Sequence, residues 1–266
     1  LAAFEAVAPL PGAMERWGEV RAVARRLFDL ADRTPSIVAG PDPSPVPRDT
    51  SVVFSSVRLR YAPDSPPALD GLDLEIPDGR HVAILGPSGA GKSSLGRLLV
   101  RFWDYEGEIR LGGHDLRRYR PDDLRRIVGI ATQDAQLFNG SVRDNLLMAA
   151  PDADTTALEQ FLEVVQLAEF VRGLPDGIDT WIGEAGARLS AGQARRLVLA
   201  RALLRDPRIL ILDEPTENLD AGTARQLIAS LRAATQGRTV ILITHDPRAA
   251  AQFTDEIVHM EGGRIS

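Results

Sequence analysis

The chain has 266 residues, of which 44% are hydrophobic and 26% charged, and its formal net charge is −6. This length and composition support one large or two small domains with an ample apolar core. The acidic balance argues against nucleic-acid binding, and the absence of cysteine excludes disulfides and thiolate metal sites. No apolar run in the sequence reaches the roughly 18 residues that a membrane-spanning helix needs.

The first 34 residues carry apolar side chains at helical spacing and predict a helix from about Gly12 to Asp32. Prolines at positions 41, 43, 45 and 47 then predict a stiff, extended linker. The pattern fits both a surface helix packed on its own domain and the tail of a preceding membrane helix. Because the chain starts at Leu1 with this pattern already under way, we expect it to be part of a longer protein.

Strand and helix patterns alternate through the rest of the chain. Short strands are predicted at 52–54, 57–61, 72–76, 82–85, 128–131, 209–212 and 240–243. A small hairpin is predicted around 109–113, a helix near 121–126, and helices from 141 to about 170. The continuous apolar runs separated by helices indicate a parallel sheet that helices cover on both faces.

One glycine-rich segment fits G-x-x-x-x-G-K-[ST] at every fixed position, between an apolar strand and a helical pattern. The predicted phosphate-binding residues are Gly86, Pro87, Ser88, Gly89, Ala90, Gly91, Lys92, Ser93 and Ser94. Main-chain N–H groups of such a loop and the N-terminus of the following helix bind phosphate oxygens. Lys92 can reach the outer phosphates and Ser93 can bind Mg²⁺. The segment therefore predicts binding of a nucleoside triphosphate.

Polar residues follow two of the buried strands, where ligands gather in open α/β sheets. Asp213 can hold Mg²⁺, and Glu214 can polarise the attacking water as a general base. His245 can fix the position of the γ-phosphate. The alternatives are an acidic strand end that caps the next element and a structural histidine.

Ser190 and Gln193 have the spacing of a capping box and predict the start of a long helix. Local interactions alone explain this pattern as a capped helix start with no further function. The same geometry also offers free N–H groups and a hydroxyl as a second anion-binding face.

Taken together, these motifs resemble the nucleotide-binding domain of ATP-binding cassette (ABC) transporters. Residues 189–193 look like the LSGGQ signature, residues 209–214 like the Walker B strand with its glutamate, and residues 218–220, ending at Asp220, like the D-loop. Gln133 looks like the Q-loop glutamine, His245 like the switch histidine, and Tyr61 like the aromatic that stacks on adenine. The likeness covers residues 51–266.

The resemblance implies an α/β fold: a P-loop NTPase core with a parallel sheet, a small antiparallel β subdomain and a helical subdomain at about 134–193. On this basis residues 48–266 are the ABC domain, and residues 1–47 are the tail of a membrane domain and a proline-rich linker. It also implies that two such domains pair head to tail around ATP and Mg²⁺. Ser190, Gly192 and Gln193 then serve the partner's nucleotide, and Gln133 contacts Mg²⁺ and the water.

Two segments, residues 137–145 and 181–186, resemble the exporter branch, in which the membrane domain is fused N-terminally and residues 137–145 sense it. Within that branch, residues 1–6, 181–184 and 214–220 look most like the C subunit of heterodimeric exporters linked to cytochrome bd assembly. That resemblance implies export of thiols such as cysteine or glutathione, a link to haem, and a different subunit as partner. It places the domain, soluble as a fragment, at the cytoplasmic face of the inner membrane.

The signature departs from the family pattern at Ala191, where glycine is usual. A methyl group at this helix N-terminus can loosen its contact with a γ-phosphate. Our hypothesis is that the ATP site completed by this signature is the weaker of two unequal sites.

Two other functions compete with a transport ATPase. A soluble ABC-type ATPase acting on DNA or ribosomes usually carries coiled-coil insertions or tandem domains, and the sequence has neither. A regulatory domain that binds ATP without hydrolysing it usually lacks the glutamate or the histidine, and both Glu214 and His245 are present.

Overall fold

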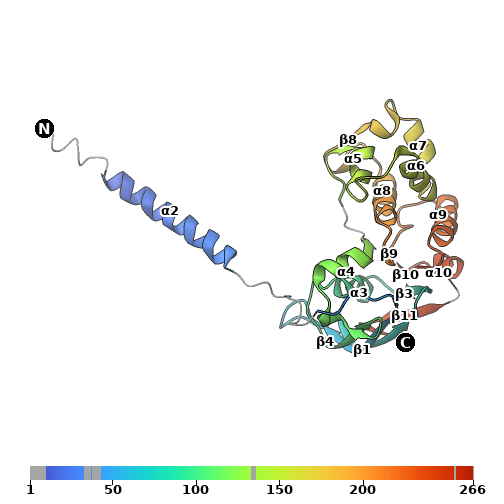
Figure 1. Cartoon of the computed structure of the whole chain (residues 1–266), viewed down its shortest axis with the longest axis horizontal. Helices are drawn as coiled ribbons and strands as arrows, with labels where there is room; N and C mark the ends of the chain where they lie inside the picture. Colours follow the sequence, from blue (N-terminus) through green and yellow to red (C-terminus); the bar gives the residue numbers. More distant parts are fainter. Residues whose placement is uncertain (1–9, 33–36, 38–42, 133–135, 255, 266) are drawn as a thin grey trace. The chain divides into compact units, whose positions relative to one another are not determined.

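The computed structural model describes residues 10–32, 37, 43–132, 136–254 and 256–265. The chain divides into two compact units, residues 1–38 and residues 39–266. Helix α2 lies in the first unit, and all strands of the described residues lie in the second (Figure 1).

Helix α2 spans Leu10–Ala31, close to the predicted range. Large apolar side chains from Trp17 to Leu30 are exposed, among them Trp17 at 70% and Leu27 at 62%. None of the helices in the described ranges is long and apolar enough to cross a membrane.

Within the described residues, a six-stranded sheet runs through the second unit in the order β12-β11-β3-β10-β9-β6. Its strands are β3 (His81–Leu85), β6 (Val128–Ala131), β9 (Ile209–Asp213), β10 (Thr239–Thr244), β11 (Ile257–Glu261) and β12 (Arg264–Ile265). Neighbours from β11 to β6 pair in parallel, and β12 pairs antiparallel with β11. The apolar runs predicted at 82–85, 128–131, 209–212 and 240–243 are confirmed as four consecutive parallel strands of this sheet. Strands β11 and β12 were not predicted.

The central strands bury both faces. Ile241 and Ile243 pack into one apolar core, and Val240 and Leu242, which alternate with them, pack into a second. Each side chain is fully buried. This is why the central strands read as continuous apolar runs rather than as alternating patterns.

A four-stranded antiparallel sheet, in the order β2-β1-β4-β5, covers the first of these cores. Its strands are β1 (Val52–Leu59), β2 (Leu69–Ile76), β4 (Glu106–Leu111) and β5 (His114–Asp115). The two segments predicted at 52–54 and 57–61 are one strand. A bulge between Phe54 and Val57, with Ser56 at a φ of 50°, breaks the alternation that sequence patterns rely on.

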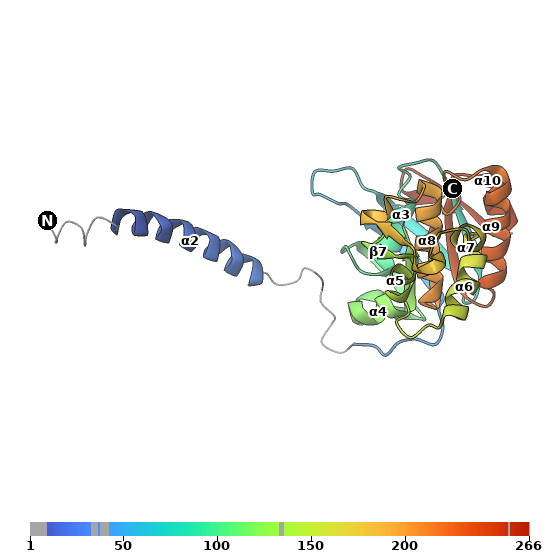
Figure 2. The same cartoon turned by 90° about the horizontal axis from the view of Figure 1, so that it is seen from above.

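Helices contribute to both cores. They are α3 (Lys92–Leu99), α4 (Pro121–Ile127), α5 (Val142–Leu147), α6 (Thr155–Val164), α7 (Ala168–Arg172), α8 (Ala191–Leu204), α9 (Ala221–Ala234) and α10 (Pro247–Phe253). Short 3₁₀ turns lie at Leu116–Arg118, Gly177–Asp179 and Glu184–Gly186. Helices α9 and α10 pack side by side (Figures 1 and 2).

Helices α5, α6 and α7 gather with a small ribbon of β7 (Gly140–Ser141) and β8 (Trp181–Gly183) at the end away from β1 and β4 (Figure 1). Helix α8 contacts α5 and α6 on one side and β6 and β9 on the other. It therefore ties this helical part to the parallel sheet.

The last part of the proline-rich segment, residues 43–50, belongs to the second unit and packs against the rest of it, and we call it the strap. The main-chain N–H of Ser44 donates to the carbonyl oxygen of Arg118 at 2.8 Å. The guanidinium of Arg208 donates to the carbonyl oxygen of Pro47, which is buried. The described end of the predicted linker is thus docked on the domain.

We expect Thr50→Val to lower the free energy of unfolding by about 1–3 kcal/mol, because it removes the two hydrogen bonds that a buried hydroxyl makes. The Thr50 side chain is 4% exposed. Its hydroxyl lies 2.6 Å from the hydroxyl of Thr239 and also donates to Asp78, and both hydrogen bonds disappear in the variant. Urea unfolding measures the change. The control is Ser51→Ala, because Ser51 is the next residue and is half-buried. This variant should change the free energy of unfolding by less than about 0.5 kcal/mol.

Candidate functional site

The phosphate loop leads from β3 into α3 and depends on its glycines. Gly89 and Gly91 have φ values of 81° and 96°, a backbone region that favours glycine. A Cβ on Gly91 would lie 2.2 Å from the carbonyl oxygen of Ala68, and one on Gly86 would lie 2.1 Å from that of Met260. The loop therefore has room only for glycine at Gly86 and Gly91.

Lys92 is the only lysine in the chain and is 6% exposed. Its Nζ donates to the carbonyl oxygens of Gly86 at 2.6 Å and Pro87 at 2.9 Å. The positive charge thus lies against the main chain of the loop, within reach of a phosphate that the loop holds.

Asp213 ends β9 beside the loop and is 7% exposed. Burial raises the pKa of this carboxyl group, and a hydrogen bond from the Ser93 hydroxyl opposes the rise. A carboxylate and a hydroxyl in contact at the end of a phosphate loop are hard oxygen ligands. They fit a hydrated Mg²⁺ ion.

Glu214 follows with a φ of 49°, in the left-handed region that is costly for a residue with a Cβ. Its Oε1 lies 2.9 Å from His245 Nδ1, and its Oε2 accepts a 3.3 Å hydrogen bond from Thr244. The carboxylate is largely buried and the imidazole is exposed, with 11% and 58% of the side chains accessible. Such strain in a residue held by several contacts is typical of active sites.

Arg195 of α8 holds the backbone at this point. Its Nη1 donates to the carbonyl oxygen of Glu214 at 3.1 Å and forms a short ion pair with Glu217. Only 13% of the Arg195 side chain is exposed. The helix that begins at the signature therefore contacts the main chain of Glu214 directly.

These groups surround one cavity of about 310 Å³, which we call the phosphate-loop cavity. Its lining consists of Tyr61, Ala68, residues 88–94, Arg97, Asp213, Glu214, Glu217 and His245. The structure thus brings together the predicted loop, Asp213, Glu214, His245 and Tyr61. Parallel strands cause this convergence because β3, β9 and β10 end at the same edge of the sheet.

The signature residues are not part of this lining. Ser190 and Gln193 form the predicted capping box: the Gln193 N–H donates to Ser190 Oγ at 3.2 Å, and the Ser190 N–H donates to Gln193 Oε1 at 2.9 Å. Ser190 and Ala191 are exposed. Gly192 is buried, and a Cβ there would lie 2.9 Å from Leu219. The signature is thus a separate, exposed helix start.

Two other predicted residues also lie apart from the cavity. Asp220 caps α9, and hydrogen bonds from Thr223 and Gly222 lower its pKa. Gln133 lies outside the described residues. The assigned roles of all these residues stay predictions.

Sequence reasoning missed Arg97, Arg195 and Glu217. Arg195 and Arg97 stand on helix faces where arginine is common and carries no motif. For Glu217 the only signal was its place three residues after Glu214.

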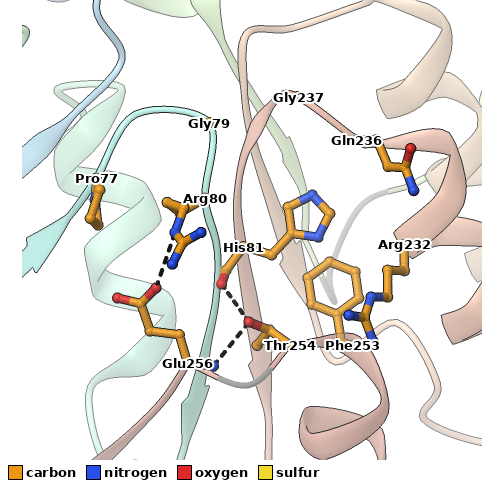
Figure 3. Close-up of a pocket in the computed structure, with 10 residues that line it drawn as sticks. All are labelled: Pro77, Gly79, Arg80, His81, Arg232, Gln236, Gly237, Phe253, Thr254 and Glu256. Atoms are coloured by element: carbon orange, nitrogen blue, oxygen red, sulfur yellow. Dashed lines mark hydrogen bonds and ion pairs between the residues drawn. The ribbon is translucent and has the colours of Figure 1, made fainter.

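A larger cavity, of about 610 Å³, lies at the opposite ends of the strands (Figure 3). His81, which begins β3, stacks on Phe253 with ring centroids 4.9 Å apart. The Thr254 hydroxyl donates to the carbonyl oxygen of His81 at 2.6 Å, and Arg80 forms a 4.0 Å ion pair with Glu256. This cavity is at the amino ends of the strands, so it is distinct from the phosphate loop.

We expect Asp213→Asn to stabilise the chain against unfolding at neutral pH. Because the pKa of Asp213 is raised, its ionised form is less favourable in the folded chain than in the unfolded chain. This loss of stability begins as the pH rises through the ordinary carboxyl pKa of 3.8 and is complete above the raised pKa. Urea unfolding of both proteins from about pH 4 to 8 should show a difference that grows and then levels off.

Asp144 provides a control of opposite sign. Hydrogen bonds from the Ser141 main chain and side chain lower the pKa of Asp144, so its ionised form stabilises the fold. Asp144→Asn should lower stability at neutral pH, and the difference should vanish as the pH falls through the lowered pKa. A gain for Asp213→Asn that is equal at every pH would contradict the assignment.

The family model described as "ABC transporter" matches residues 69–217, more than half of the chain. The chain belongs to the ABC transporter family. Its fold is that of the ABC ATPase domain, with a P-loop core, a parallel sheet, a separate antiparallel sheet and helices. It is an ATP-binding domain of an ATPase family.

Relatives confirm the exporter resemblance. The chain is 39% identical, over all of its 266 residues, to the glutathione/L-cysteine transport system ATP-binding/permease protein CydC of Escherichia coli K12, covering 46% of that protein. It is 43% identical over 216 residues, 80% of the chain, to an ATP-dependent lipid A-core flippase of Ralstonia nicotianae, covering 36% of it.

Among solved structures, it matches a bacterial Atm1-family ABC exporter with ATP bound, with a TM-score of 0.85 and 35% identity. The match covers 94% of the chain and 44% of that exporter. The chain thus spans less than half the length of each of these relatives.

Proposed function

We propose that the chain is the ATP-hydrolysing motor domain of an ABC exporter and pairs head to tail with a second such domain around ATP. One observation carries this proposal. Lys92, Asp213, Glu214 and His245 meet at one cavity, whereas the exposed signature start at Ser190 lies apart from it. We infer from this separation that the signature serves the phosphate loop of another domain.

In this mechanism, the loop N–H groups and Lys92 hold the β- and γ-phosphates of ATP. Mg²⁺, when bound, would neutralise charge on these phosphates, and Ser93 and Asp213 are the residues that would hold it. Glu214 accepts a proton from the attacking water, and its hydrogen bond with His245 aims the carboxylate. The strained backbone of Glu214, held by Arg195, keeps the carboxylate in place.

A third cavity, of about 440 Å³, is the surface that we assign to the membrane domain. It is lined by Gly129, Ile130, Phe138, Met148, Ala149, Val198, Arg201, Ala202 and Arg205. Phe138 and Met148 are 51% and 55% exposed. Asn145, fully buried, fixes the main chain of Phe138 by hydrogen bonds of 2.8 and 3.0 Å. A cavity with exposed apolar side chains beside two arginines suits a helix end of a membrane domain fused N-terminally.

The likeness to CydC, which runs over the whole of this chain and 46% of that protein, supports a thiol such as cysteine or glutathione as the exported substrate and a different subunit as the partner. It also supports a position at the cytoplasmic face of the inner membrane. The test uses inside-out vesicles that contain the full-length transporter. We expect ATP-dependent uptake of labelled cysteine or glutathione, and no uptake with Glu214→Gln. If neither thiol stimulates ATP hydrolysis and neither is taken up, the assignment of a thiol substrate is wrong.

We expect Ala191→Gly in the assembled transporter to raise ATP affinity at the partner's site about twofold to fivefold. The reason is that the helix N-terminus, exposed at Ala191, can then approach the γ-phosphate more closely. Nucleotide binding and turnover of the paired transporter measure the effect. If both stay unchanged, the hypothesis of two unequal sites is wrong.

A further inference from the structure

Trp103 is a large apolar side chain left 41% exposed in the loop after α3. Its ring meets the ring of Tyr61 edge to face, with centroids 5.0 Å apart and an interplanar angle of 85°. This is the preferred geometry of an aromatic pair. Tyr61 lines the phosphate-loop cavity, and Trp103 is not among its lining residues.

Two further contacts hold the Tyr61 ring. Its hydroxyl lies 2.8 Å from the Ser94 hydroxyl, at the start of α3. The guanidinium carbon of Arg97 lies 5.9 Å from the ring centroid, and Arg97 Nη1 donates to the Tyr61 hydroxyl at 3.5 Å. Ser94 and Arg97 both stand on the helix that carries Lys92. The ring is therefore fixed relative to the phosphate-binding residues.

We propose that Trp103 is a positioning residue for nucleotide binding: it holds Tyr61 at the distance from the phosphate loop that a nucleobase requires. This inference rests on the proposed stacking of Tyr61 on the base. A flexible aromatic would lose rotational freedom on stacking, whereas a ring fixed by Trp103 has already lost it. Trp103 thus acts on the base and not on the phosphates.

The experiment compares the affinities of MgATP and of inorganic triphosphate with Mg²⁺, measured by calorimetry on the full 266-residue chain. Triphosphate uses the phosphate loop alone. The dissociation constant of MgATP divided by that of triphosphate therefore isolates the contribution of the base. We expect Trp103→Ala to weaken ATP binding about threefold to tenfold and to leave triphosphate binding unchanged. Trp103→Phe keeps an aromatic edge and should restore most of the affinity.

Phe102 supplies the matched control. It precedes Trp103, is 57% exposed, and lies under the guanidinium of Arg125 at 5.5 Å. Phe102→Ala should leave both affinities unchanged. A second reference is Tyr61→Ala, which removes the stacking surface itself and should weaken ATP binding about tenfold or more.

The outcomes separate this inference from the proposed function. If Tyr61→Ala raises the ratio and Trp103→Ala does not, the positioning role is wrong and the stacking role of Tyr61 stands. If Trp103→Ala weakens ATP and triphosphate equally, Trp103 supports the loop as a whole and the inference is also wrong. If Tyr61→Ala leaves the ratio unchanged, the stacking itself is refuted, and with it the role of Trp103.

Discussion

Glu214→Gln is expected to lower the rate of ATP hydrolysis about 10²- to 10⁴-fold while ATP still binds. The amide keeps the shape of the side chain but cannot accept the proton of the attacking water. It can also still accept the hydrogen bond from Thr244 that the carboxylate accepts at 3.3 Å. Phosphate release under saturating ATP, together with equilibrium binding of ATP, measures the two effects separately.

Glu217→Gln is the matched control, since Glu217 lines the same cavity and is also a glutamate. Its carboxylate is paired with Arg195, so it does not face the water as a free base. We expect this variant to keep most of its activity. Equal losses in the two variants would contradict the assignment of Glu214 as the general base.

Lys92→Met is expected to weaken ATP binding about 10- to 100-fold, the range that hydrogen bonds from a charged group to phosphate oxygens span. Methionine has nearly the same length and no charge, so the 6% exposed site stays filled. Calorimetry with MgATP measures the change. Unchanged affinity would show that the loop N–H groups alone hold the nucleotide.

Because Lys92 is the only lysine of the chain, an amine-reactive reagent gives a second, independent measurement. We expect MgATP to slow the labelling of Lys92, read by mass spectrometry of the peptide that contains it. The chain's terminal amine serves as the internal control. Equal labelling of Lys92 with and without ATP would place the nucleotide away from it.

Most of the site could be predicted because its residues carry motifs with fixed spacing. The glycine pattern identified the loop, and the rule that parallel strands end at one edge brought Asp213, Glu214 and His245 to it. The capping box at Ser190 was likewise a local pattern, and the structure confirms it.

The missing parts depend on tertiary contacts that leave no periodic signal. Arg195 contacts Glu214 only because α8 passes beside β9. The proline spacing predicted a stiff, extended linker, but it carries no signal for the Arg208 guanidinium that donates to the carbonyl oxygen of Pro47. Strand β11 was missed because it has no continuous apolar run: only its first two residues, Ile257 and Val258, are apolar neighbours.

The central claim is that each ATP site combines this chain's phosphate loop or its signature with the complementary part of a second domain. Orthovanadate trapped with MgATP takes the place of the γ-phosphate, and ultraviolet light then cleaves the chain beside it. In the assembled transporter we predict cleavage of this chain both within residues 86–93 and at Ser190. Cleavage confined to residues 86–93 would mean that the signature never meets a γ-phosphate, and would contradict the account.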